Sequence, residues 1–125
     1  MLGPQDKEFL RVKAVFKCKE VLAARGWQVG ESDAKCVYDI FAIKNEKLIK
    51  IQVRSSSKCS KEGIPYFKTC RILFNTKRAV RTSFNKGDFD YWFFYYNGDC
   101  WLIPFDEITT VSQVRITGYD QYFVN

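Results

Sequence analysis

The first stretch of the chain places its apolar residues at helical spacing. Between Asp6 and Ala24 they recur every three or four positions, and Gly26 follows where a left-handed C-terminal cap would fall. The pattern predicts a helix over residues 6–24. Its apolar positions include Phe9, Val12, Val15, Phe16, Leu22 and Ala23.

Later stretches have the patterns of strands. The two apolar runs of residues 89–104 are joined by Asn97 and Gly98, a strong hairpin signal. A short helix is expected from Asp106, and no linker or repeat divides the chain. We predict one domain over residues 1–125, of the α/β (α+β) class, with the first helix packed on a mixed sheet of about five strands. The other predicted strands cover residues 27–31, 36–43 and 48–55, with a turn at 45–47.

The strand IKIQVRS (49–55) has two different faces. Its isoleucine and valine residues point to one side, and Lys50, Gln52 and Arg54 point to the other, because successive side chains of a strand alternate. If the preceding strand pairs antiparallel with it, Asp39 lies near Gln52 and Arg54. A carboxylate, an amide oxygen and a cation then converge at one edge of the sheet.

This combination suits phosphodiester hydrolysis. Mg²⁺ needs only one or two protein carboxylates, so Asp39, the side-chain oxygen of Gln52 and the backbone carbonyl of Val53 are candidate ligands for Mg²⁺ or Mn²⁺. Arg54 would stabilise the charge that builds up on the phosphate. The alternative interpretation is an exposed sheet face that happens to be polar.

Positive charge is concentrated in the middle of the sequence. Residues 54–86 hold nine basic side chains and one acid, a net charge of +8, whereas the rest of the chain nets −2. Aromatic and amide side chains lie between the cations, so we expect this segment to bind nucleic acid rather than to be only a solvated loop or a membrane-binding surface. The polar face of residues 71–77 is the candidate for reaching base edges. The candidate DNA-binding residues are Lys58, Lys61, Lys68, Arg71, Asn75, Lys77, Arg78 and Arg81.

The remaining composition excludes several kinds of site. The chain has no histidine, and its five cysteines contain no C-x-x-C pair, so mechanisms that need histidine, zinc sites and a disulfide framework are not expected. Buried thiols are expected instead. No run approaches the roughly 18 apolar residues of a membrane helix, and the start of the sequence has no apolar signal segment. We therefore expect an intracellular protein, in the cytoplasm or nucleoid, with no membrane partner.

Four segments in order resemble one known family. They are RGWQV (25–29), the pair Tyr38 and Asp39, IQVR (51–54), and FDYWFFYYNGDCWLIPFDEI (89–108). Their order and spacing resemble the small PD-(D/E)XK endonucleases that include group I intron-encoded homing endonucleases. The resemblance implies a restriction-endonuclease-like core, a Mg²⁺-dependent deoxyribonuclease acting on double-stranded DNA, and a homodimer or homotetramer that covers a long site.

Two positions depart from the pattern of that family. Arg54 stands where the family has lysine, and arginine neither donates nor accepts a proton at neutral pH. The family's glutamate on the first helix would fall near Val15 or Phe16, and Glu8 lies too far along the helix to replace it. The alternatives to an active endonuclease are therefore a nuclease-derived DNA-binding protein with weak or no catalysis, and a structure-specific junction nuclease.

Overall fold

The computed structural model describes residues 4–33, 35–74, 79–110 and 112–124. It contains one long helix, nine strands and two 3-10 turns within these residues. The elements are α1 (Pro4–Ala24), β1 (Gln28–Glu31), β2 (Ile40–Lys44), β3 (Lys47–Ser55), β4 (Tyr66–Lys68), β5 (Arg71–Phe74), β6 (Ala79–Thr82), β7 (Tyr91–Tyr96), β8 (Asp99–Pro104), η1 (Phe105–Glu107), β9 (Gln113–Arg115) and η2 (Asp120–Tyr122).

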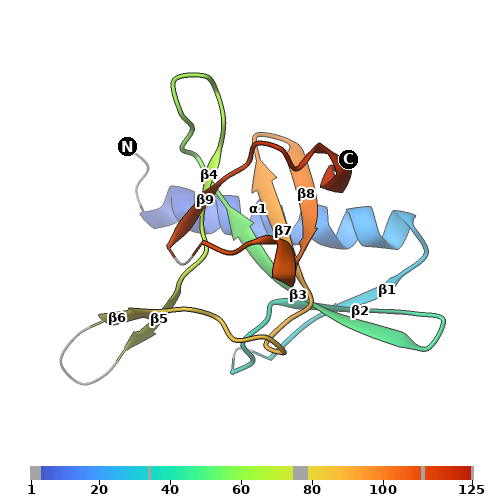
Figure 1. Ribbon diagram of the computed structural model, residues 1–125. Coiled ribbons are helices and arrows are strands. Elements are labelled where there is room, and N and C mark those ends of the chain that lie inside the picture. Colours follow the sequence, from blue (N-terminus) through green and yellow to red (C-terminus); the bar gives the residue numbers. More distant parts are fainter. Residues whose placement is uncertain (1–3, 34, 75–78, 111, 125) are drawn as a thin grey trace.

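The helix ends as the sequence predicts. Gly26 has a φ of 87°, and the amides of Gly26 and Trp27 donate to the carbonyls of Ala23 and Leu22. This pair of hydrogen bonds is the Schellman arrangement, which a glycine accommodates without strain. The capped helix lies across the back of the main sheet in Figure 1.

Five strands form the main sheet, in the order β1-β2-β3-β7-β8. Neighbouring strands are antiparallel except β3 and β7, which are parallel, so the sheet is mixed. Asn45 and Glu46 both have positive φ in the tight turn from β2 to β3. Asn97 and Gly98 also have positive φ, in the tight turn from β7 to β8. The predicted class, helix and five-stranded mixed sheet are confirmed.

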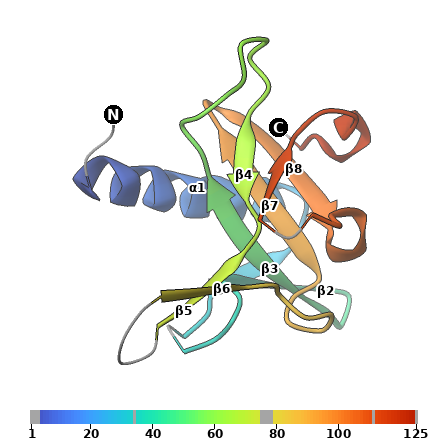
Figure 2. The ribbon, with the colours of Figure 1, turned by 60° about the vertical axis from the view of Figure 1, so that its left-hand side comes forward.

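Each face of the sheet has its own core. Ile49, Ile51 and Val53 of β3 pack with buried residues of α1 on one face. The other face is aromatic: Trp92 and Phe94 of β7 belong to a second buried cluster with residues of β4, β8 and β9. Gln52 and Arg54 therefore point towards the aromatic side, away from the helix. Figure 2 shows the β5–β6 hairpin and the loop from β3 to β4 standing away from this body.

Two predicted elements differ from the structure. Residues 36–39 do not belong to a strand, because a turn at Asp33 precedes them. The carboxylate of Asp33 accepts the amide of Lys35, and its carbonyl accepts the amide of Cys36. The strand begins only after Asp39. The short helix expected from Asp106 is a single 3-10 turn, since the backbone becomes extended at Ile108 and two β-branched threonines follow.

The cysteines are only partly as predicted. Cys18, Cys70 and Cys100 are buried and form no disulfide, but Cys36 and Cys59 are exposed, since both lie in loops. Within the described ranges, no helix has the length and apolar character needed to cross a membrane.

Candidate active centre and nucleic-acid interface

Asp39 lies at the start of β2, opposite the middle of β3. Ile40 pairs with Ile51 in the antiparallel ladder, and the amide of Asp39 donates to the carbonyl of Ile51 at 2.9 Å. The Oδ2 atom of Asp39 accepts the amide of Val53 at 2.9 Å. These two hydrogen bonds fix the carboxylate against β3, between the positions of Gln52 and Arg54.

Gln52 is the buried polar residue of this centre, with 6% of its surface exposed. With the amide oriented to satisfy both neighbours, its Nε2 donates to the carbonyl of Val37 at 2.8 Å, and its Oε1 accepts from Nη1 of Arg54 at 2.6 Å. The reverse orientation of the amide would place oxygen against the Val37 carbonyl and nitrogen against the guanidinium. The side-chain oxygen is thus aimed at Arg54.

Arg54 is held by the protein on several sides. Its Nε donates to the carbonyl of Lys68 at 3.3 Å, and its Nη2 donates to that of Cys70 at 3.4 Å. The guanidinium carbon lies 5.6 Å from the ring centre of Phe84 and 5.9 Å from that of Trp92. Arg54 therefore connects β3 to the β4–β5 segment through backbone oxygens and aromatic rings.

Burial lowers the pKa of the Arg54 guanidinium from its ordinary value, while the Asp39 carboxylate and the Cys70 thiol act in the opposite direction. Arginine still carries its charge at neutral pH. The centre therefore contains one fixed positive charge next to one carboxylate.

The predicted metal ligands meet, but they do not fit a divalent cation as arranged. Among the described residues, no three acidic, cysteine or histidine side chains gather closely enough to hold a metal ion. The oxygens of Gln52 and Val53 both face Nη1 of Arg54, at 2.6 Å and 3.5 Å. A Mg²⁺ or Mn²⁺ ion on these oxygens would stand against a like charge.

A groove of about 670 Å³ opens beside Arg54. It lies between the first turns of α1, the end of β3 with the loop that follows, and β4. Five of its lining side chains are basic and none of the residues that line it is acidic. We call this the basic groove; its cations are Lys7, Arg11, Arg54, Lys58 and Lys68.

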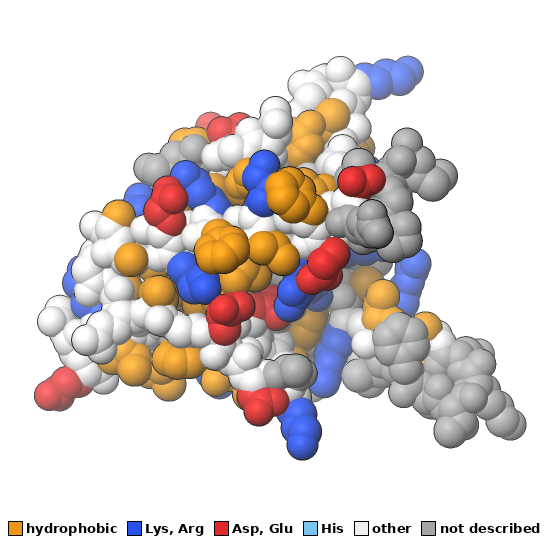
Figure 3. Space-filling model, turned by 180° about the vertical axis from the view of Figure 1, so that it is seen from behind, with side chains coloured by type: hydrophobic (Ala, Val, Ile, Leu, Met, Phe, Trp, Pro, Cys, Tyr) orange, Lys and Arg blue, Asp and Glu red, His pale blue; other side chains and the backbone are white. Residues whose placement is uncertain are grey.

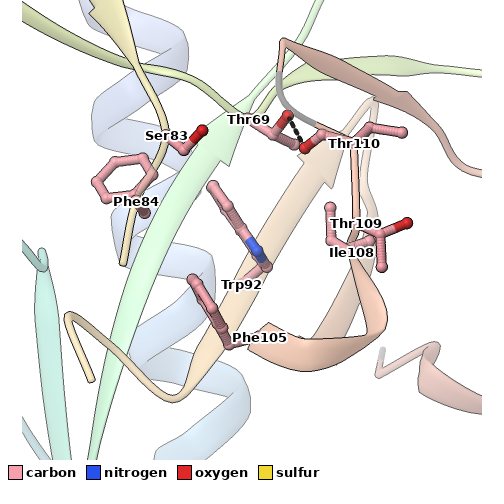
Figure 4. A pocket seen from close by; sticks show the side chains of 8 residues that line it. All are labelled: Thr69, Ser83, Phe84, Trp92, Phe105, Ile108, Thr109 and Thr110. Carbon is pink, nitrogen blue, oxygen red and sulfur yellow. Dashed lines mark hydrogen bonds between the residues drawn. The ribbon is translucent and has the colours of Figure 1, made fainter. Parts of the chain in front are cut away.

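A smaller pocket, of about 200 Å³, adjoins the rings that flank Arg54. Figure 4 shows Phe84 and Trp92 on one side of it and Thr69, Ile108, Thr109 and Thr110 on the other. The hydroxyl of Thr69 donates to the carbonyl of Thr110 at 3.2 Å and joins these two residues on one side of the pocket. The buried Nε1 of Trp92 has no hydrogen-bond partner within the described part of the protein.

The candidate DNA-binding residues that the structure describes come from the β3–β4 segment and from the β5–β6 hairpin, whose residue Ile72 also lines the basic groove. Lys58 and Lys68 line the basic groove, whereas Arg71 and Arg81 lie on the hairpin of β5 and β6. Lys61 is exposed in the loop between β3 and β4. Asn75, Lys77 and Arg78 lie outside the described residues.

Lys7 and Arg11 of α1 also line the groove, although neither is among the DNA-binding residues predicted from the sequence. They are four residues apart, which places them on one face of a helix. That spacing was a usable signal, but only the packing of α1 shows which surface the face meets. Val15, at the position of the family's helix glutamate, is an apolar core residue and has no carboxylate. Glu8 pairs with Arg11 at 3.4 Å on the surface of α1.

A structure search adds independent evidence on the fold. The chain is similar to a bacterial homing endonuclease, I-Ssp6803I, with a TM-score of 0.73 and 24% sequence identity. The match covers 96% of this chain and 82% of that chain. At this identity the likeness is evidence of a shared fold. No curated protein matches the chain significantly.

A family model also matches the sequence. The model, described as PD-(D/E)XK endonuclease, matches residues 13–121. That span includes the centre formed by Asp39, Gln52 and Arg54 and most of the sheet. Together with the fold, it shows that this chain belongs to the PD-(D/E)XK endonuclease family.

Proposed function

We propose that this chain is a DNA endonuclease that binds the backbone of double-stranded DNA in the basic groove and hydrolyses it slowly at the Asp39 centre. The observation that carries the proposal is the groove: five cations and no acid line a cavity that leads to Arg54, whose guanidinium contacts Gln52. Family membership supports the hydrolytic part of the proposal.

The lining of the groove suits phosphate groups in two ways. Lysine and arginine neutralise phosphates and release condensed counterions, which favours binding to any sequence. Ser55, Ser56, Ser57 and Tyr66 add hydroxyl donors between the cations. The groove thus offers backbone contacts, and sequence recognition would come from other residues.

Slow hydrolysis follows from the position of Arg54. Its N–H groups face oxygens of Gln52, Val53, Lys68 and Cys70, and arginine cannot exchange a proton with a water molecule at neutral pH. Lys50, the other cation on this face of β3, donates to the carbonyl of Gly87 at 2.9 Å. Asp39 is therefore the residue we propose for orienting the attacking water.

Cleavage of supercoiled plasmid, assayed with Mg²⁺, Mn²⁺ and EDTA, tests this proposal. We expect slow nicking by the natural chain, none by Asp39→Ala, and a rise of roughly ten-fold or more in Arg54→Lys, because lysine can act in proton transfer. Binding of the same DNA by Asp39→Ala should be retained.

Retained binding without cleavage by any variant in any metal would contradict the enzyme proposal. The chain would then be a nuclease-derived DNA-binding protein, the function that the tightly held Arg54 favours as the second candidate. Faster cleavage of four-way junction DNA than of linear duplex would instead indicate a junction nuclease.

We further propose that the chain self-associates through the outer face of α1. Phe9 and Phe16 are 64% and 63% exposed, and Val12 lies between them on the same face. Figure 3 shows hydrophobic side chains in the middle of this side of the molecule, among both basic and acidic ones. A stripe with charges of both signs at its borders can pair with a second copy of itself about a two-fold axis.

Sedimentation at increasing concentration tests the association. We expect the natural chain to form a dimer or tetramer and Phe9→Glu/Phe16→Glu to be monomeric, because the exposed rings would be replaced by like charges. Leu48→Glu, at an exposed apolar residue of β3, is the control and should associate normally. A natural chain that stays monomeric at the highest concentration would refute the interface.

A further inference from the structure

The guanidinium of Arg54 lies against two oxygens that are candidate ligands for a metal ion. Its Nη1 is 2.6 Å from Oε1 of Gln52 and 3.5 Å from the carbonyl oxygen of Val53. The shorter contact is a strong, charge-assisted hydrogen bond. Asp39 supplies the nearby negative charge that would otherwise balance a bound cation.

The oxygen of Gln52 has no freedom to turn towards another partner. Its amide nitrogen donates to the carbonyl of Val37, and the side chain is buried. Turning the amide by half a circle would set two oxygens against each other. Gln52 therefore presents its oxygen to Arg54.

A divalent cation and the guanidinium cannot share this place. Mg²⁺ binds oxygen at about 2.1 Å, so an ion on Oε1 of Gln52 would lie within about 5 Å of Nη1 whatever its direction. Two positive centres at that distance repel strongly in a partly buried site. An ion on the oxygen of Gln52 must therefore compete with Nη1 of Arg54, which already occupies it.

Displacing Arg54 would break contacts on several sides of its guanidinium. The carbonyls of Lys68 and Cys70 accept from Nε and Nη2, and the rings of Phe84 and Trp92 flank the guanidinium plane. Leaving the site would break both hydrogen bonds, of which the one to Cys70 is partly buried.

We propose that Arg54 is a built-in cation that takes the place of the divalent metal ion in this member of the family. The centre then carries a fixed positive charge without a metal, and divalent ions do not bind to it in the free protein. The inference rests on the proposed placement of the centre at Asp39. Because its test contains no DNA, a failure would leave the proposed DNA-binding groove unaffected.

Binding of Mn²⁺ to the protein without DNA, measured by the electron paramagnetic resonance signal of the free ion, tests the inference. Arg54→Met removes the charge and keeps an unbranched stem against the two rings. We expect it to bind Mn²⁺ at least about ten-fold more tightly than the natural chain, and we expect Arg54→Met/Asp39→Asn to lose the gain. Lys47→Met removes one exposed charge from the same strand and should change nothing.

Two results would overturn the inference. One is Mn²⁺ binding by the natural chain that Asp39→Asn abolishes, because a metal ion would then share the centre with Arg54. The other is a folded Arg54→Met variant that binds Mn²⁺ no more tightly than Lys47→Met. If circular dichroism shows that Arg54→Met does not fold, the natural chain and Asp39→Asn still decide: equal affinity supports the inference and unequal affinity refutes it.

Discussion

Replacing Lys58 and Lys68 by glutamine is expected to weaken duplex DNA binding roughly 50-fold at about 0.1 M salt and to reduce the salt slope by about two. Both lysines line the basic groove, one in the loop after β3 and one at the end of β4. Each one that contacts a phosphate releases about one counterion. Affinity measured by fluorescence anisotropy over a range of salt concentrations gives both quantities.

The matched control is Lys35→Gln/Lys47→Gln. Both lysines are exposed and lie outside the groove. Replacing them changes the net charge of the chain by the same amount as replacing Lys58 and Lys68. A small, equal effect of the two double variants would mean that only total charge attracts the DNA, and the groove would lose its role. Loss of affinity for one DNA sequence but not for others would mean that the lysines contact bases rather than phosphates.

Ile51→Ala is expected to lower the free energy of unfolding by about 2–5 kcal/mol, the usual cost of a cavity at a buried isoleucine. Ile51 is fully buried in the middle of β3, where it pairs with Ile40 on one side and Tyr91 on the other. The same strand carries Gln52 and Arg54. Urea unfolding followed by far-ultraviolet circular dichroism measures the change.

Leu48→Ala removes the same number of carbon atoms from the same strand, but Leu48 is 54% exposed. It should cost less than about 0.5 kcal/mol. If Ile51→Ala does not fold, Ile51→Val should still cost about 0.5–1.5 kcal/mol. Similar losses for Ile51→Ala and Leu48→Ala would contradict the assignment of the β3 faces.

The approach of Asp39 to Gln52 could be predicted because it depends on short-range rules. Alternation along residues 49–55 determines the faces of the strand, and the tight turn at Asn45 and Glu46 determines the antiparallel partner. Both rules act within about fifteen residues of sequence. The hairpin at Asn97 and Gly98 was predictable for the same reason.

The environment of Arg54 was not predictable in this way. Its partners include Lys68, Cys70, Phe84 and Trp92, which reach it only through the crossover from β3 to the parallel strand β7. Nothing in the spacing of the strand shows that the arginine turns back onto protein oxygens. The contribution of α1 to the basic groove is likewise a result of helix placement.

The basic segment shows the limit of counting charges. Among its nine cations, Arg54, Lys58 and Lys68 line the groove, whereas Arg71 and Arg81 lie on the β5–β6 hairpin, which contributes Ile72 to the same groove. The position of a basic residue in the sequence does not show which surface of the folded protein its side chain faces. The predicted direct reading of bases by residues 71–77 remains a prediction.

The most direct test of the central claim, that DNA lies in the basic groove beside Arg54, is a nuclear magnetic resonance titration of the labelled protein with a short duplex. The account predicts that the largest shifts of amide signals fall on residues 7–11, 54–58 and 66–68, with little change in β1 or in the turn between β2 and β3. Shifts concentrated on β1 and that turn, with residues 54–58 unchanged, would contradict it.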